Sequence, residues 1–277
     1  MFTTERFFLK RFIRADFVYM APPFLAYYGA ATLNATFLRA GVEQVMLYRD
    51  VLTTNITTGA ASPPSSHPAN AAGLWTHILS EWWSEPGLWA SGNGWAAAGA
   101  TRVLATLVKA PLSMFLFHPS TNPVNGGLTT TWKQNSINSL VKVITDILDA
   151  AMRMETDPDQ DGLLRNYLDD PTWFGEISGS SLLASVAYRL ATLSSTYNLI
   201  PRSKARAYVA WAESIRTIIA TKGHIVNGVA TPAVNPLNWG DRNPFTSGSP
   251  EGQNFVILMY AAWRDCVKAG VSGCRVV

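Results

Sequence analysis

The chain has 277 residues, 48% of them hydrophobic, which is enough for a sizeable core and too much for a disordered chain. Lys and Arg number 22 against 19 Asp and Glu, a net charge of +3 without a basic run, so no nucleic-acid surface is expected. Two cysteines, Cys266 and Cys274, exclude a disulfide framework and a Cys-rich metal site, and they can pair or stay reduced. Ten Trp is a high number, so some are expected to line a pocket.

No segment reaches the roughly 18 uninterrupted apolar residues of a membrane span. The nearest, residues 17–37, follows a basic flank and is similar to a signal peptide, but Asp16 lies in the flank and Pro22-Pro23 interrupts the run. A soluble core helix is therefore favoured. An extracellular location is expected if the full-length gene encodes a signal peptide, and no clear signal is present in this chain. Two sequons compatible with secretion are Asn34-Ala-Thr36 and Asn55-Ile-Thr57.

Apolar residues recur at helical spacing along most of the chain, and two further segments are apolar on nearly all sides. With the segment after Asp16, these signals predict about seven long helices. The only strand signal is a short hairpin at residues 224–231. In chain order, the helical signals are Leu38, Val42, Val45 and Met46; residues 95–109; Leu140, Ile144, Ile147, Leu148 and Ala151; residues 177–193; Tyr208, Trp211, Ile215, Ile218 and Ile219; and Phe255, Leu258, Met259 and Ala262.

Long polar connections separate the predicted helices, and such loops on a helical scaffold are where sites usually lie. No segment has the composition of a linker, so residues 1–277 are expected to form one domain, with residues 1–15 as an atypical lead-in. Paired antiparallel helices with long loops favour an all-α toroid of helical hairpins over a tight bundle.

The densest cluster of aromatic residues and glycines lies at residues 73–95. Trp rings stack on sugar faces, and Gly92 and Gly94 let the backbone approach a ligand closely. His77 can hydrogen-bond a hydroxyl or a carboxylate. The alternative is a loop packed by its own aromatics before a helix that Asn93 helps to start.

Two acidic residues are further candidates. Asp16 is flanked in sequence by apolar residues, where a charged acid is costly to bury, so it is a candidate proton donor. The alternatives are a helix N-cap or a surface acid. Glu176 follows Trp173-Phe174 at the head of a small-residue helix. It is either a helix N-terminal carboxylate favoured by the helix dipole or part of a pocket wall.

The segment Asp157-Pro-Asp159-Gln-Asp161-Gly162 resembles the first half of a calcium loop, but Leu168 occupies the position of the bidentate Glu. An Asp-rich turn is therefore the favoured interpretation. The motifs of serine hydrolases, nucleotide-binding P-loops, zinc proteases and thiol redox sites are not found in the sequence. No metal and no cofactor is expected.

Five segments, in order and at matching spacing from about Asp16 to about Lys268, resemble the unsaturated rhamnogalacturonyl hydrolases of glycoside hydrolase family 105. Each motif is short, but five in order are much more specific than one. The segments are residues 15–26, which resemble D-x-x-x-M-x-x-P-F-L-A; residues 73–77, G-L-[WY]-x-H; residues 89–95, W-x-x-G-N-G-W; residues 161–164 with 176–180, D-G-L-W … E-x-S-x-S; and residues 249–253, the start of the last helix.

The resemblance implies an (α/α)6 toroid and a small oligosaccharide substrate that ends in a 4,5-unsaturated uronic acid, a product of pectin degradation. An acid would protonate C4 of the C4=C5 bond and water would add at C5. By motif match that acid is Asp16, and His77 and Trp95 match substrate-contacting positions. Trp89 is expected to shape the same wall, and Ser91, Asn93 and Glu176 complete the expected substrate-binding set.

Two departures from the family pattern matter. Ser91 stands where family members often carry an Arg suited to hold the uronate. Only fifteen residues precede Asp16, where the family has several helices, so the toroid is expected to be incomplete on its N-terminal side. Two alternatives follow: a catalytically impaired member with at most sugar binding, and an unsaturated glucuronyl hydrolase. The oligomeric state stays open.

Overall fold

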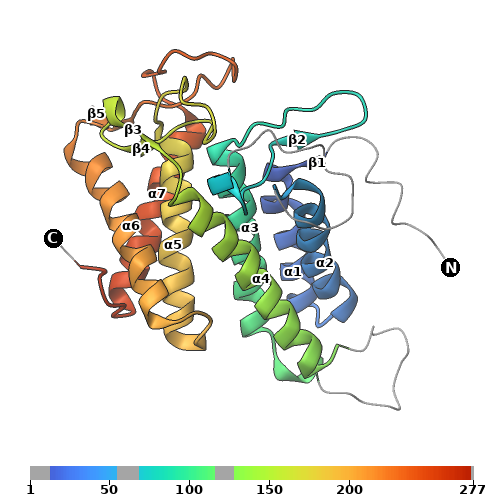
Figure 1. Ribbon diagram of the computed structural model, residues 1–277. Helices are drawn as coiled ribbons and strands as arrows, with labels where there is room; N and C mark the ends of the chain where they lie inside the picture. The colour runs from blue at the N-terminus through green and yellow to red at the C-terminus, as the bar shows by residue number, and fades with distance from the viewer. Residues whose placement is uncertain (1–12, 55–68, 116–127, 276–277) are drawn as a thin grey trace.

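Figure 1 shows the computed structural model, which describes residues 13–54, 69–115 and 128–275. Within these ranges the chain forms seven α-helices and short paired strands, so the all-α prediction is confirmed. The second sequon, at Asn55, lies outside the described residues. The helices are α1 (Ala21–Ala31), α2 (Ala35–Leu52), α3 (Ala90–Lys109), α4 (Thr130–Ala151), α5 (Ile177–Tyr197), α6 (Arg202–Thr221) and α7 (Pro250–Lys268).

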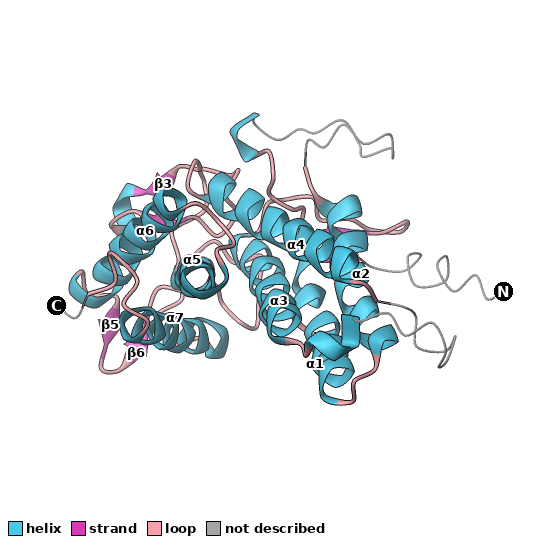
Figure 2. Ribbon diagram, turned by 90° about the horizontal axis from the view of Figure 1, so that it is seen from below, coloured by secondary structure: helices cyan, strands magenta, loops and turns pink. Residues whose placement is uncertain are grey.

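The helices form an arc of two layers, seen nearly end-on in Figure 2. Helices α1, α3, α5 and α7 pack one against the next as the first layer. Helices α2, α4 and α6 form the second layer, and each packs mainly on the helix that precedes it in the chain. This alternation of layers along the chain is that of stacked helical hairpins, as the toroid prediction requires.

Burial follows the sequence pattern. In α2, Leu38, Val42 and Val45 are buried on one stripe, while Asn34 caps the helix by accepting hydrogen bonds from the next turn. Helix α5 is different, because α3, α6 and α7 all pack against it and residues 177–188 are all buried. This explains why its sequence is apolar or small on every side rather than on one stripe.

Two glycines allow close approach of backbones near the site described below. A Cβ at Gly99 in α3 would lie 2.2 Å from the carbonyl oxygen of Val18. A Cβ at Gly179 in α5 would lie 2.5 Å from the Cβ of Ala90 at the start of α3. The start of α5 can therefore lie against the start of α3, and the segment around Val18 against the middle of α3, only without these side chains.

Three two-residue strand pairs join the loops. β5 (Ile225–Val226) and β6 (Val229–Ala230) form the predicted hairpin, and its turn residues Asn227 and Gly228 both have positive φ, of 51° and 82°. The other two pairs were not predicted, because two residues are too few to show alternation. They are β1 (Ile13–Arg14) with β2 (Ile78–Leu79), and β3 (Thr156–Asp157) with β4 (Leu163–Leu164).

The Asp-rich segment forms the turn between β3 and β4. The Asp157 carboxylate accepts hydrogen bonds from the backbone N–H groups of Asp159 and Gly175, and Arg165 lies 3.6 Å from it. Asp161 is in the left-handed conformation that ends this turn. No group of three or more potential metal ligands occurs among the described residues. The segment thus stabilises the loop through backbone contacts, as the Asp-rich turn interpretation expects.

Two further features complete the fold. Cys266 and Cys274, whose pairing the sequence left open, form a disulfide that joins the end of α7 to the following loop. Across the described parts of the chain, no helix combines the length and the apolar composition that a bilayer span requires.

Candidate active site

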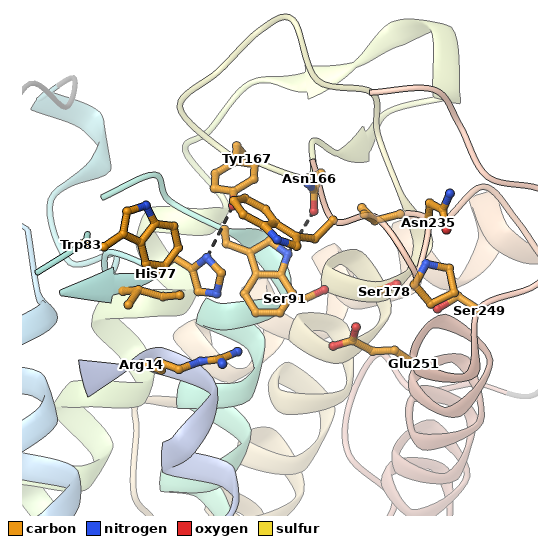
Figure 3. Close-up of a pocket in the computed structure, with 15 residues that line it drawn as sticks. Arg14, His77, Trp83, Ser91, Asn166, Tyr167, Ser178, Asn235, Ser249 and Glu251 are labelled. Atoms are coloured by element: carbon orange, nitrogen blue, oxygen red, sulfur yellow. Dashed lines mark hydrogen bonds between the residues drawn. The ribbon is translucent and has the colours of Figure 1, made fainter. Parts of the chain in front are cut away.

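The candidate site is a pocket of about 340 Å³ where the loops meet the upper ends of the helices (Figure 3). It combines aromatic walls with a small number of polar and charged groups, the usual composition of a small-molecule site. The residues that line it are Arg14, His77, Ile78, Trp83, Trp89, Ser91, Asn166, Tyr167, Ser178, Val234, Asn235, Pro236, Trp239, Ser249 and Glu251.

Three helices of the first layer begin at this pocket. Ser91 lies in the first turn of α3, Ser178 in the first turn of α5, and Glu251 in the first turn of α7. Each helix N-terminus carries about half a positive elementary charge from its unpaired N–H groups. The three converging helix starts therefore make the pocket favourable for a negatively charged group.

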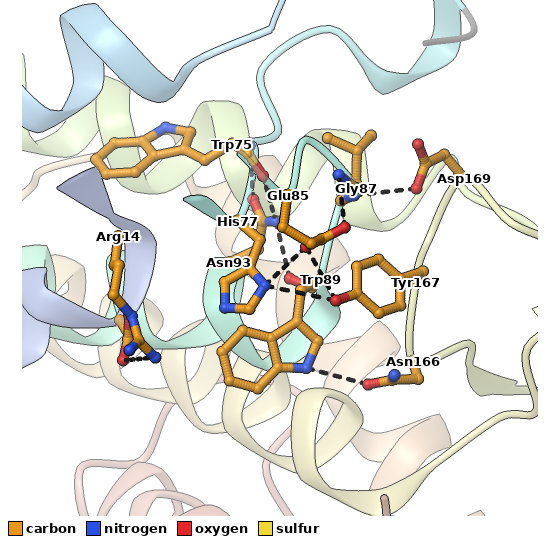
Figure 4. Close-up of polar contacts among 12 residues, drawn as sticks. Arg14, Trp75, His77, Glu85, Gly87, Trp89, Asn93, Asn166, Tyr167 and Asp169 are labelled. Carbon is orange, nitrogen blue, oxygen red and sulfur yellow. Dashed lines mark hydrogen bonds and ion pairs between the residues drawn. The ribbon is translucent and has the colours of Figure 1, made fainter. Parts of the chain in front are cut away.

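His77 is held in the pocket by a carboxylate (Figure 4). Its Nδ1 lies 2.7 Å from Glu85 Oε2, and the Tyr167 hydroxyl donates to the same oxygen at 3.0 Å. Burial, followed by the charge of Glu85, raises the pKa of Tyr167, which keeps the hydroxyl protonated. The buried Nε2 of His77 has no hydrogen-bond partner among the described residues. Glu85 and Tyr167 thus orient His77 so that one ring nitrogen is left for a ligand.

Trp89 forms a wall of the pocket. Its ring centre lies 4.4 Å from that of His77, and its indole N–H donates to Asn166 Oδ1 at 3.0 Å. Backbone pairing of Trp89 with Tyr167 joins the start of α3 to the β4 loop. The indole is therefore fixed in orientation, as a stacking platform for a sugar must be.

Arg14 and Asp16 approach the pocket from β1 and the short helix that follows it. The Arg14 guanidinium donates to both carboxylate oxygens of Asp16, each at 3.1 Å. The Asp16 side chain is 19% exposed. Instead of the apolar surroundings expected from the sequence, Asp16 has a bidentate ion pair with Arg14, which stands two residues before it in the chain.

Glu251 is the second carboxyl group of the site. The indole N–H of Trp95 donates to its Oε1 at 2.8 Å. Burial raises the pKa of Glu251; the Trp95 hydrogen bond opposes this shift and the charge of Asp16 adds to it. Burial therefore favours the protonated form of Glu251, and the nearby charge of Asp16 acts in the same direction.

The structure separates the predicted site residues into three groups. His77, Trp89 and Ser91 line the pocket, whereas Asp16 and Trp95 contact its lining residues Arg14 and Glu251.

The remaining two predicted residues make structural contacts instead. Glu176, fully buried, accepts from the N–H groups of Ser178 and Gly179, each at 2.5 Å, and burial raises its pKa to about 7. It is the helix N-terminal carboxylate that the sequence offered as one interpretation. Asn93, equally buried, is bound entirely to the backbone of Trp75 and Trp89, so neither residue lines the pocket.

Sequence reasoning missed several lining residues. Arg14 was seen only as part of a basic flank, and Glu251 only as the start of a helix. Trp239 lies in a Pro- and Asn-rich loop, and its ring is 6.3 Å from that of Trp83. A lone charged or aromatic residue far from the main cluster carries no local signal of where the fold brings it.

The sequence profile of Glycosyl Hydrolase Family 88 matches residues 10–262. The chain belongs to this family. No curated protein shows significant similarity to it. Three similar solved structures are a possible member of the GH105 family from Salmonella enterica, at TM-score 0.63 and 19% identity; a possible member of that family from Klebsiella pneumoniae, at 0.64 and 17%; and a family 105 glycoside hydrolase of C. acetobutylicum, at 0.63 and 14%.

These likenesses support the six-hairpin glycosidase fold that the motifs implied. The three structures match 91%, 93% and 92% of this family 88 chain. Conversely, the chain spans only 56%, 57% and 65% of the length of those proteins.

Proposed function

We propose that the chain acts on oligosaccharides ending in a 4,5-unsaturated uronic acid, and hydrolyses them by acid-catalysed hydration of the C4=C5 bond. The observation that carries this proposal is the composition of the pocket: aromatic walls, an arginine that pairs with Asp16, and the buried carboxyl group of Glu251 among converging helix N-termini. The family membership supports a glycosidic substrate. The galacturonyl-rhamnose product of pectin lyases is the proposed substrate, and an extracellular role in pectin degradation goes with it.

The aromatic residues fit a sugar of two rings. Trp89 is fixed beside His77 inside the pocket and is suited to stack on the unsaturated ring. Trp83 and Trp239 are 47% and 57% exposed at the pocket's edge. Their faces are suited to a second sugar that extends toward solvent. The orphan Nε2 of His77 is suited to a hydroxyl of the first ring.

The chemistry needs one carboxyl group that starts protonated. Asp16, the motif match, donates its proton to C4; a C–H bond forms, and positive charge develops at C5 and the ring oxygen. Water then attacks C5 and returns a proton to the same carboxylate. The resulting hemiketal opens to a ketone, and collapse at C1 releases the next sugar. Glu251, with its raised pKa, is placed to keep the site's total charge low while Asp16 is protonated.

The test is incubation with lyase-digested rhamnogalacturonan while the ultraviolet absorbance of the conjugated double bond is followed. We expect the absorbance to fall with the wild-type chain and not with Asp16→Asn. Glu43→Gln, a change in α2 away from the pocket, is the matched control and should behave as wild type. Equal loss of absorbance with Asp16→Asn would overturn the assignment, and no loss with any substrate would overturn the proposed activity.

An unsaturated glucuronyl substrate is the second candidate. A fold neighbour at TM-score 0.61 and 12% identity is a UGL variant in complex with dGlcA-Glc-Rha-Glc. Elimination makes C4, the only carbon at which galacturonic and glucuronic acids differ, part of the double bond, so the two unsaturated rings are the same. The substrates differ in the linkage and in the next sugar, so both belong in the substrate panel. Preferential turnover of the glucuronyl compound would replace the galacturonyl assignment.

A further inference from the structure

Arg14 is the only Arg or Lys among the described residues that line the pocket. Its hydrogen bonds to Asp16 use Nε and one hydrogen of Nη2, which leaves the other N–H groups of the guanidinium without a partner among the described residues. The side chain is 49% exposed, and in Figure 3 it reaches under His77 toward the centre of the pocket. It is thus a cation whose head faces the space that a ligand would fill.

We propose that Arg14 binds the carboxylate of the sugar acid, and that this transfer of the guanidinium from Asp16 to the ligand frees Asp16 to hold the proton it donates. The inference rests on the proposed function for the identity of the ligand. It assigns to Arg14 both the selection of an acidic sugar and the timing of proton transfer.

The backbone holds Arg14 in place for this role. Arg14 pairs with Ile78 across β1–β2, and the N–H of Ala15 donates to the carbonyl of His77 at 3.0 Å. The Arg14 side chain therefore starts beside His77, the residue that contacts the same ligand. Ser91, also in the pocket, offers a hydroxyl but no charge.

The charges that face Arg14 favour an acidic ligand. Glu85 Oε2 is engaged by His77 Nδ1 and the Tyr167 hydroxyl, and burial raises the pKa of Glu251, which reduces the negative charge opposing the ligand. The N-terminal ends of α3, α5 and α7 add positive potential. A carboxylate entering the pocket thus meets one full cation and three partial ones.

The link to Asp16 follows from the geometry of the ion pair. Arg14 donates to both carboxylate oxygens of Asp16, so a proton on either oxygen has to take the place of one of these hydrogen bonds, whereas the proposed reaction begins with a proton on Asp16. A ligand carboxylate offers Arg14 the same planar, bidentate partner. Occupation of Arg14 by the ligand therefore leaves both carboxylate oxygens of Asp16 open to that proton.

Binding is tested first, with a saturated galacturonyl-rhamnose disaccharide, which has no double bond to react, and its methyl ester. Titration calorimetry compares wild type, Arg14→Gln, Arg14→Lys and the control Arg49→Gln, which breaks a similar exposed pair with Asp50 on α2. We expect wild type and the control to prefer the acid about tenfold or more, as a charge-assisted hydrogen bond implies. Arg14→Gln should lose this preference, and Arg14→Lys should keep part of it.

Turnover is the second readout, with the unsaturated disaccharide and its methyl ester. The ester cannot draw Arg14 away from Asp16, so wild type should turn it over slowly. Arg14→Gln should raise kcat for the ester and raise KM for the acid. If Arg14 had only a structural role, its replacement would lower activity toward the acid and activity toward the ester together.

Each outcome separates the inference from the proposed function. An unchanged preference for the acid in folded Arg14→Gln overturns the binding assignment, and a lower kcat for the ester in that variant overturns the release of Asp16. If no unsaturated sugar is turned over but the preference disappears with Arg14→Gln, the hydrolase proposal fails and the binding assignment stands. Thermal unfolding of each variant establishes that it is folded.

Discussion

Replacing Asn93 by Ala should destabilise the fold strongly, although the sequence placed this residue among the sugar contacts. Asn93 is fully buried. Its Oδ1 accepts from the Trp75 N–H at 2.8 Å, and its Nδ2 donates to the carbonyls of Trp75 and Trp89, each at 3.0 Å. The Trp89 carbonyl keeps a helical partner in the Asn93 N–H, whereas both backbone groups of Trp75 lose theirs.

The magnitude follows from those two orphaned groups. A buried donor or acceptor left unpaired costs about 1–3 kcal/mol, so Asn93→Ala should lower the free energy of unfolding by about 2–6 kcal/mol. At roughly 2 °C per kcal/mol for a domain of this size, the melting temperature should fall by at least about 4 °C.

Urea and thermal unfolding followed by circular dichroism measure this change. Asn138→Ala is the matched control, because Asn138 lies on the exposed side of α4 and is bonded only by Gln134 among the described residues. It should change the free energy of unfolding by less than about 0.5 kcal/mol. Affinity for the saturated disaccharide, measured on the folded fraction of Asn93→Ala, should stay as in wild type. A variant of wild-type stability with weakened sugar binding would refute the reasoning.

Three further predictions follow from the same region. Because burial raises the pKa of Glu176 to about 7 from 4.5, the folded chain binds more protons than the unfolded chain between these values; the contribution of this group to stability is complete below about pH 4.5 and is lost as pH rises to about 7. Glu176→Gln should flatten that part of the stability profile, and an unchanged profile would contradict the assignment. Gly99→Ala should destabilise the fold by about 1–3 kcal/mol, since its Cβ would meet the Val18 carbonyl at 2.2 Å; urea unfolding with wild-type stability would argue against this packing. Glu85→Gln should lower kcat/KM about tenfold or more by releasing His77, and an unaffected rate would exclude this orienting role.

Local patterns in the sequence were enough to predict the helices and the region of the site. The apolar spacing of the helices and the hairpin at residues 224–231 depend on residues close together in the sequence, so their signals are local and were interpreted correctly. The cluster at residues 73–95 likewise supplies His77, Trp89 and Ser91 to the pocket. Its motifs also indicated the six-hairpin glycosidase fold.

Which polar groups face the ligand and which hold the backbone depends on contacts between distant parts of the chain. Asn93 and Glu176 belong to motifs, yet their carboxamide and carboxylate are bound by buried backbone groups, whose positions depend on how α3 and α5 pack. Arg14 and Glu251 come from opposite ends of the chain and meet because β1 pairs with β2 while α7 packs on α5. Such long-range contacts leave no periodic trace, since each depends on a single side chain. The net charge of +3 therefore carries no information about the ligand of the pocket, whereas the position of one arginine in that pocket carries the strongest proposal about it.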